Sequence, residues 1–229
     1  MINWLFLNAY PLYKPLYYNY KRISDRRLIS WMKGYLNKGM VAVDIGANIG
    51  FYTELLSDIV GDRGKVYSFE PDEANFRYLE NNVGDRKNVI LQKSAVGDRN
   101  GIIDLYLSDK FNTDHHTYKN EEARTTKKIK SVSLDKFFGS SEHIDFIKSD
   151  IQGFDYFATK GASQLIRRQK EIAIIGEFWP YGLRKAGVNP QEYINLLKSM
   201  KLNVTLYLPE SLNILETKKE YYTDFIAYK

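Results

Sequence analysis

A glycine-rich turn between an apolar strand and a helix constrains this 229-residue chain more than any other feature. The segment VAVDIGANIGFYTELL predicts a buried strand over Val41–Ile45, followed by a helix from Phe51. The turn holds Gly46 and Gly50, which let the backbone approach a ligand closely, and Asn48, which tolerates left-handed backbone geometry. A strand that enters such a turn and then a helix is typical of the first unit of a ligand-binding α/β fold.

Strand and helix patterns continue to alternate along the chain. Alternation requires crossover connections, which place helices on both faces of a mainly parallel sheet. We therefore predict an α/β fold with a doubly wound sheet, closed at its edge by an antiparallel hairpin. The predicted strands are Val41–Ile45, Lys65–Phe69, Asn88–Ser94, Ile144–Ser149, Glu171–Phe178, Val204–Leu208 and Asp224–Tyr228; the predicted helices are Asp25–Leu36, Phe51–Val60, Glu73–Val83, Asp155–Arg168 and one that begins at Asn189 and Pro190.

One region interrupts this alternation. Gly101–Ser108 and Ile129–Leu134 have strand patterns with no helix between them, only a polar stretch over residues 109–128. We predict an inserted hairpin over about residues 101–134. We expect a single domain over residues 1–229, with a core over residues 39–229 behind an N-terminal helical arm of residues 1–38.

The arm is rich in aromatic residues, and Pro11 and Pro15 interrupt it. We expect its rings to pack on the domain, or on a second subunit in a homodimer; the alternative is contact with a membrane surface. No apolar run in the sequence approaches the roughly 18 residues that a membrane-spanning helix needs. We therefore expect a chain without a transmembrane segment.

Composition narrows the chemistry further. The absence of cysteine excludes disulfides and thiolate-bound zinc or iron–sulfur sites, and it fits a reducing compartment, so we expect a cytoplasmic protein. Lys and Arg number 33 against 28 Asp and Glu, a net charge of +5 that is too small to indicate nucleic acid. No nucleic-acid-binding motif accompanies the basic clusters, so we expect no nucleic-acid partner.

Two acidic residues at strand ends indicate the charge of the ligand. Asp44 precedes the turn, where a carboxylate repels phosphate and attracts an ammonium or sulfonium group. Glu70 ends the next strand and can accept hydrogen bonds from two ribose hydroxyls. A dinucleotide motif starting at Gly46 needs glycine where the chain has Asn48 and Phe51. These residues disfavour a nicotinamide cofactor, and an NAD-type oxidoreductase is kept as the alternative.

The D-x-G-x-x-x-G spacing of Asp44, Gly46 and Gly50 resembles the first motif of class I S-adenosylmethionine-dependent methyltransferases. Among these, the chain is similar to the FkbM-type family. The resemblance implies a seven-stranded sheet in the order 3-2-1-4-5-7-6, S-adenosylmethionine as cofactor, and O-methylation of a sugar, glycan or natural-product hydroxyl. The matching segments cover most of Val41–Pro180 and read VDIGANIGFYT, KVYSFEPDEANFRYLENNV, NVILQKSAVGD, VSLDKFF, IDFIKSDIQGFDYFATKGA and IIGEFWP.

The resemblance also implies which residues bind the cofactor. Glu70 corresponds to the ribose ligand, Lys93–Val96 to the segment beside adenine, and Asp150 to the acid beside the methionine end and the methyl group. The family usually has glutamate where this chain has Gln152, which can form hydrogen bonds but cannot act as a base. The complete expected set is Asp44, Gly46, Ala47, Asn48, Gly50, Phe51, Glu70, Pro71, Ser94, Ala95, Asp150 and Gln152.

Catalysis and acceptor binding are expected from a few further residues. A hydroxyl nucleophile gains from a general base, and histidine suits that role near neutral pH. The family often has an Asp-His pair in the inserted loop, matched by Asp114 and His115, so we expect that loop to close over the acceptor and deliver His115 as the base. Asp150 is the other catalytic candidate. Glu177 and Trp179 are expected to contact the acceptor, and we assign no metal to the Asp150–Glu177 pair.

The acceptor itself is not identified by the sequence. An amine acceptor is disfavoured, because the strand that ends in SDIQG lacks the N-P-P-Y type of motif that amino-group enzymes carry. A small-molecule or glycan hydroxyl is the expected acceptor. An RNA methyltransferase and a catalytically inactive cofactor-binding subunit are the remaining alternatives.

Overall fold

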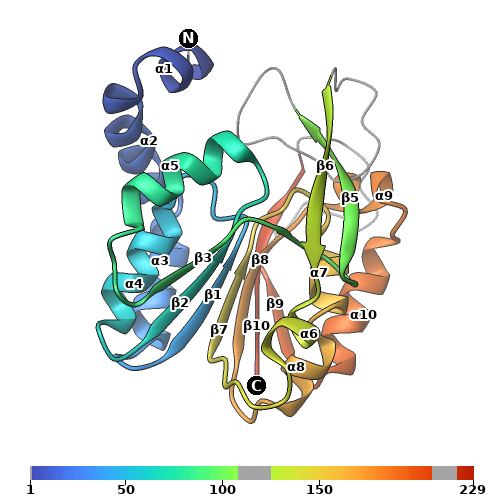
Figure 1. Cartoon of the computed structure of the whole chain (residues 1–229). Coiled ribbons are helices and arrows are strands. Elements are labelled where there is room, and N and C mark those ends of the chain that lie inside the picture. Colours follow the sequence, from blue (N-terminus) through green and yellow to red (C-terminus); the bar gives the residue numbers. More distant parts are fainter. Residues whose placement is uncertain (1, 108–124, 208–220) are drawn as a thin grey trace.

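The computed structural model describes residues 2–107, 125–207 and 221–229, and the strands of its main sheet alternate with helices. The strands are β1 (Val41–Ile45), β2 (Lys65–Phe69), β3 (Val89–Gln92), β7 (Phe146–Ser149), β8 (Ala173–Phe178), β9 (Asn203–Leu206) and β10 (Thr223–Tyr228). They form a seven-stranded sheet in the order β3-β2-β1-β7-β8-β10-β9 (Figure 1), in which only the pairs made by β10 are antiparallel. Counted without the inserted strands, this is the predicted order 3-2-1-4-5-7-6, so the expected fold class is confirmed.

Helices cover both faces of the sheet (Figure 1). Neighbouring residues of a strand point to opposite faces, so Ala42 and Ile175 join one buried core while Val43 and Ile174 join the other. Burial on both faces explains why the strands read as apolar runs rather than as alternating ones. The helices α3 (Arg26–Tyr35) and α4 (Phe51–Val60) pack on the first face, α7 (Asp155–Lys160), α8 (Ser163–Arg168) and α10 (Pro190–Ser199) pack on the second, and α5 (Glu73–Val83) lies against α4.

Side-chain caps set the starts of two predicted helices. The Asn189 side chain accepts a hydrogen bond from the Gln191 backbone N–H at 3.0 Å, and Pro190 occupies the first turn of α10. Asp72 caps α5 by accepting from the backbone N–H groups of the second and third residues of that helix. Both starts follow from local chemistry and agree with the sequence prediction within one residue.

The single helix predicted over Asp155–Arg168 is wrong, because the structure divides it into α7 and α8. Gly161 lies between them, and a Cβ there would be 2.0 Å from the carbonyl oxygen of Gly97. Only glycine, which has no Cβ, fits this close approach between the two backbone segments. The Asp135 carboxylate accepts hydrogen bonds from the backbone of Gln164 and Leu165, and it thereby supports the new helix start at α8.

The inserted hairpin is confirmed. β5 (Gly101–Leu107) and β6 (Thr125–Val132) pair antiparallel, and the short β4 (Ala95–Val96) adds to β6 in a second, three-stranded sheet. The second hairpin strand was predicted to run to Leu134 but ends at Val132, because Ser133 caps a helix that the sequence analysis missed, α6 (Leu134–Phe138). A further missed helix, α9 (Pro180–Lys185), follows β8 directly.

The N-terminal arm forms two helices, α1 (Ile2–Asn8) and α2 (Tyr10–Ser24), ahead of α3. Its prolines do not interrupt it as expected: Pro11 lies in the first turn, where its missing N–H is not needed, and α2 continues through Pro15. Rings of the arm pack on the domain, since Phe6 is buried and Tyr10 stacks on Tyr78 of α5 with ring centres 3.6 Å apart. Packing on a second subunit stays a prediction.

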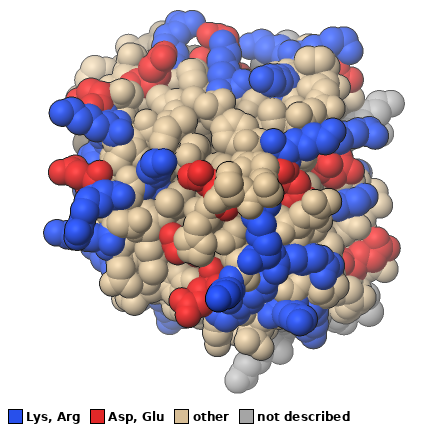
Figure 2. Space-filling view, turned by 60° about the horizontal axis from the view of Figure 1, so that its bottom comes forward, with Lys and Arg blue, Asp and Glu red and all other residues tan. Residues whose placement is uncertain are grey.

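Surface charge is mixed on the face drawn in Figure 2. Basic and acidic side chains there are interspersed around a mostly uncharged centre. Within the part of the chain that the structure describes, no helix combines the length and apolar character needed to cross a membrane.

Candidate active site

Backbone geometry shapes the turn after β1. Gly46 has a φ of 79° and Asn48 a φ of 51°, both in the left-handed region. The backbone N–H groups of Gly46 and Ala47 each donate to the carbonyl oxygen of Phe69 at 3.0 Å, which ties the turn to the end of β2. A Cβ at position 46 would lie 2.4 Å from the carbonyl oxygen of Asp150. Position 46 therefore requires glycine for both its backbone conformation and its neighbour.

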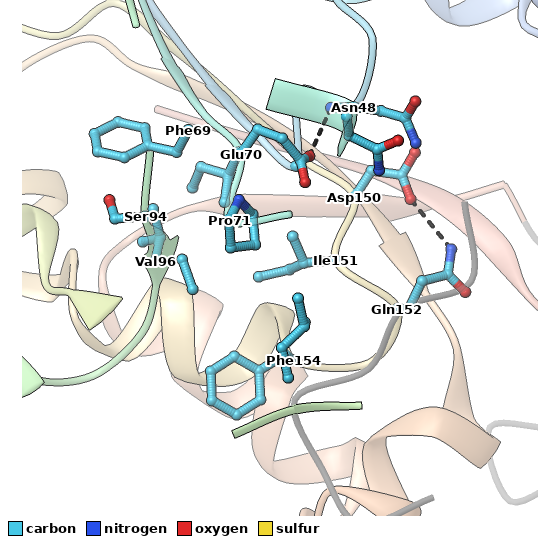
Figure 3. A pocket seen from close by; sticks show the side chains of 15 residues that line it. Asn48, Phe69, Glu70, Pro71, Ser94, Val96, Asp150, Ile151, Gln152 and Phe154 are labelled. Carbon is cyan, nitrogen blue, oxygen red and sulfur yellow. Dashed lines mark hydrogen bonds between the residues drawn. The ribbon is translucent and has the colours of Figure 1, made fainter. Parts of the chain in front are cut away.

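A first pocket opens between this turn, the end of β2 and the loop after β7 (Figure 3). Glu70 and Asp150 lie at one end of it and Phe154 at the other (Figure 3). Its apolar walls come from side chains such as Val96 and Ile151. The pocket thus joins an apolar slot, which suits a flat aromatic ring, to a polar end with two carboxyl groups.

Glu70 is almost fully buried and serves two backbone donors. Its Oε2 accepts from the N–H of Asn48 at 2.8 Å, and its Oε1 accepts from the N–H of Asp72 at 2.9 Å. Burial raises the pKa of Glu70 to about 7, although these two hydrogen bonds lower it. Each carboxylate oxygen has a second acceptor site, so the ionised group can also accept hydroxyl donors from the pocket that it lines.

A second, larger pocket lies beside the first, across the carboxyl ends of β7 and β8. The arm closes its side, because Tyr17, Tyr20 and Lys21 of α2 line it. The residues that line both pockets are Gly46, Asn48, Asp150 and Gln152. A ligand in the first pocket would therefore meet a ligand in the second at the turn and at Asp150.

Asp150 lies at this junction. Its Oδ2 is 3.5 Å from the Lys148 ammonium, and the Gln152 side-chain amide donates to its Oδ1 at 3.5 Å. Burial acts to raise the pKa of Asp150, but the positive charges of Lys148 and Lys21 outweigh it and hold that pKa below its usual value. Asp150 is therefore ionised at neutral pH, and its negative charge faces the place where the two pockets meet.

Asp44 lies beneath the turn, fully buried, and lines neither pocket. Its Oδ2 accepts from the Thr53 hydroxyl at 2.7 Å, and its Oδ1 lies 3.6 Å from the Lys148 ammonium. Lys148 also lies over the Tyr52 ring, 4.5 Å from its centre. The buried lysine therefore links Asp44 below the turn to Asp150 above it, and its ammonium is held by two carboxylates and a ring.

Two acids from neighbouring strands line the far side of the larger pocket. Glu177 of β8 pairs directly with Asp224 of β10, and both line this pocket. Burial, followed by the negative charge of Asp150, raises the pKa of Glu177 well above its usual value and the pKa of Asp224 to about 6. In the described residues no group of three or more acidic or histidine side chains is arranged to hold a metal ion.

Most of the residues expected at the cofactor site do lie together. Asn48, Glu70, Pro71, Ser94 and Ala95 line the first pocket. Ala47 and Phe51 line the second, and Gly50 shapes the turn with a φ of 95° without lining either pocket. Among the expected acceptor residues, Glu177 lines the larger pocket, whereas Trp179 is buried beside Tyr181 outside both linings; Asp114 and His115 lie outside the described residues.

The wall formed by α2 and the contribution of β10 were not predicted from the sequence. No pattern in the sequence indicated that Tyr17, Lys21 or Asp25 would line a pocket together with residues more than a hundred positions later in the chain, such as Asp150 and Glu177. The position of Asp224 could have been predicted, because it lies at the start of a strand predicted to be antiparallel. Such a strand starts at the edge of the sheet where its parallel neighbours end.

Comparison with a family model agrees with this geometry. The methyltransferase FkbM domain matches residues 44–201, more than half of the chain. This span begins at Asp44 and includes Glu70, Asp150 and Glu177. No curated protein sequence is significantly similar to the chain.

Solved structures of methyltransferases share the fold. A protein from Clostridium thermocellum assigned as an rRNA methylase is 11% identical, with a TM-score of 0.58 over 89% of this chain and 94% of that one. A methyltransferase assigned in Streptococcus mutans, SMU.1697c, solved with S-adenosylhomocysteine, is 14% identical, with a TM-score of 0.54 over 89% and 96%. A SAM-dependent methyltransferase from Aquifex aeolicus is 20% identical, with a TM-score of 0.50 over 91% and 92%.

Proposed function

The chain belongs to the FkbM methyltransferase family, whose members use S-adenosylmethionine, and from this premise we propose that it methylates a hydroxyl group of a sugar, glycan or natural product. The observation that carries the proposal is the pair of adjoining pockets. They share Gly46, Asn48, Asp150 and Gln152, as donor and acceptor sites of a group-transfer enzyme must share a boundary.

The first pocket fits the cofactor by the chemistry of its lining. Its apolar slot beside Val96 and Phe154 suits adenine, and Glu70 suits the two ribose hydroxyls. The ionised Asp150 suits the positively charged methionine end, because opposite charges attract most strongly where solvent is limited. When bound, the cofactor supplies a methyl group already activated by its positive sulfur.

The second pocket is the proposed acceptor site, and its charges favour a neutral, hydroxyl-rich molecule. Asp25, Asp150, Glu177 and Asp224 line it, and its two lysines are already engaged, Lys21 with Asp25 and Lys148 with Asp44 and Asp150. This balance repels a phosphate backbone and offers acceptors to hydroxyl groups.

Aromatic side chains support the same choice of acceptor. Rings of Tyr17, Tyr20 and Tyr222 at the larger pocket add flat apolar surfaces on which a sugar ring can lie.

The general base is proposed to be His115, from the resemblance, with Asp150 as the second candidate. Asp224 adds a third, because a pKa of about 6 matches proton transfer near neutral pH. Burial raises the pKa of Glu177 well above its usual value, which favours the protonated form, and a protonated Glu177 can donate a hydrogen bond to the acceptor. In each arrangement the chain's main task is to hold donor and acceptor in line.

A labelled-methyl transfer screen against glycans, phenols and RNA tests the proposal. Product is expected with glycans or natural-product hydroxyls; product in the RNA lane alone would contradict it. Binding of the cofactor without turnover on any acceptor would point to an inactive subunit, and binding of a nicotinamide dinucleotide in its place would point to an oxidoreductase.

The same assay identifies the base. His115→Ala is expected to lower the turnover rate by about 10²- to 10⁴-fold, the usual range for the loss of a general base, with cofactor affinity unchanged. His116→Ala, next to it in the chain, is the matched control and is expected to change turnover much less. If both variants keep wild-type turnover across the pH range, Asp150→Asn and Asp224→Asn decide between the remaining candidates.

A further inference from the structure

The outward face of α1 and α2 carries a stripe of exposed apolar side chains. The six residues of this stripe, each between 61% and 65% exposed, are Trp4, Leu7, Leu12, Leu16, Tyr20 and Ile23. In α2 the spacing of Leu12, Leu16, Tyr20 and Ile23 places them on one side of the helix. The inner side is already satisfied, because its aromatic rings are buried against the domain.

Such a stripe is not explained by the fold, since it contributes nothing to the core. Six exposed large apolar side chains on two consecutive helices, four of them on one side of α2, are typical of a surface that meets a partner. Trp4 and Tyr20 add amphipathic rings, which are favoured at the boundary between water and lipid headgroups.

The charge of the arm identifies the kind of partner. Residues 2–24 contain no Asp or Glu, and residues 2–35 contain six Lys and Arg against the single acid Asp25. Asp25 is engaged by Lys21, while Arg22 next to the stripe is exposed. An arm with a net positive charge and an exposed apolar stripe is complementary to an anionic lipid surface. A second copy fits less well, because a two-fold interface would bring two arms of the same positive charge together.

We propose that α1 and α2 lie in the headgroup plane of an anionic lipid surface, with the stripe in contact with the lipid. Tyr20 belongs both to the stripe and to the lining of the larger pocket. The surface therefore lies next to the mouth of that pocket. If the proposed function holds, this arrangement gives an acceptor carried by a lipid direct access to the methyl donor.

Flotation with vesicles tests the proposal and needs no methyl transfer, so its outcome is independent of the proposed function. The protein is expected to float with vesicles of phosphatidylcholine mixed with phosphatidylglycerol, and much less with phosphatidylcholine alone. The variant Leu12→Ser/Leu16→Ser/Ile23→Ser is expected to lose about 100-fold or more in partitioning. Ile102→Ser, which alters an equally exposed apolar residue of β5, is the matched control and is expected to bind like the wild type.

The electrostatic part has its own readout. Arg22→Gln is expected to weaken binding to the anionic vesicles about five-fold, an effect that added salt abolishes. Every variant is expected to stay folded, because none of the altered side chains is buried, and thermal melts check this. The proposal is overturned if the wild type ignores anionic vesicles or if the triple variant binds them equally well. A wild-type dimer that the triple variant abolishes, together with absent vesicle binding, would assign the stripe to a second copy.

Discussion

Glu70 shows how one residue can serve the fold and the ligand together. Its carboxylate joins the turn at Asn48 to the start of α5 through Asp72, and it also lines the first pocket. Glu70→Ala is expected to weaken cofactor binding by about 1 to 3 kcal/mol, the cost of losing charge-assisted hydrogen bonds. Calorimetry measures this loss, and unchanged affinity would exclude Glu70 as the ribose ligand.

The same residue predicts a pH dependence of cofactor binding. The pKa of Glu70 is raised to about 7, so the carboxyl is partly protonated near neutral pH and accepts hydroxyl donors fully only above that value. Cofactor affinity is therefore expected to rise as the pH is raised from about 6 to about 8. Calorimetry on Glu70→Gln, which does not titrate, provides the control: the dependence should flatten, and a slope equal to that of the wild type would place its origin elsewhere.

Position 46 needs glycine for two reasons, the positive φ and the closeness of the Asp150 carbonyl, and substitutions can separate them. Gly46→Ala combines a positive φ with a Cβ 2.4 Å from the carbonyl oxygen of Asp150, and it is expected to cost about 3 kcal/mol or more. Gly39→Ala is the matched control: its φ is 94° but its Cβ would meet nothing within 4 Å, so about 1 kcal/mol is expected. Urea unfolding compares the two, and equal losses would show that the contact with Asp150 is unimportant.

At the scale of elements, α2 builds one wall of the larger pocket, the proposed acceptor site, and contributes no residue to the first pocket, the proposed cofactor site. Tyr13 is buried against Phe6 and helps to dock this helix. Tyr13→Ala is expected to lower the free energy of unfolding by about 3 kcal/mol and to raise the KM for the acceptor, while cofactor affinity is kept. Leu12→Ala, at an exposed neighbour in the same helix, is expected to stay within about 0.5 kcal/mol of the wild type without lipid.

Urea unfolding and steady-state kinetics check this prediction together. A loss of cofactor affinity as large as the change in KM would contradict the separation of the two pockets. That result would show that α2 supports both pockets and not the larger pocket alone.

For the whole molecule, the buried acids predict that stability falls as the pH rises. Burial raises the pKa of Glu70 to about 7 and the pKa values of Asp155 and Asp224 to about 6, from ordinary values of 4.5, 3.8 and 3.8. Between about pH 4 and 7 the folded state therefore binds more protons than the unfolded state, so the free energy of unfolding decreases through this window. Asp25 and Asp150, whose pKa values are lowered, change their contribution only below it.

Urea unfolding of the cofactor-free protein at about pH 5 and about pH 8 measures this slope. The wild type is expected to be more stable at the lower pH. Asp224→Asn should reduce the difference, because it removes one of the groups that take up a proton on folding. A protein that is more stable at pH 8 would show that these carboxyls are not buried as described.

Features that depend on neighbours along the chain were determined by the sequence itself. The strand, turn and helix around Gly46 follow from apolar periodicity and from the few residues that accept a positive φ, and the start of α10 follows from the Asn189 cap. The resemblance to a known family added the strand order and the grouping of Glu70 with Asp150. All of these agree with the structure because they rest on local chemistry or on a shared fold.

Only the tertiary structure decided what meets across the chain. Lys21, Asp150 and Asp224 come together at one pocket for two reasons. Helix α2 lies beside the carboxyl ends of β7 and β8, and β10 is antiparallel to β8, so its first residues lie at the same end of the sheet; no local pattern encodes either arrangement. The contacts at the break between α7 and α8 are also remote in sequence: Gly161 lies against the Gly97 carbonyl, and Asp135 accepts hydrogen bonds from the first turn of α8. Periodicity describes which face of an element is apolar, whereas packing determines what that face touches.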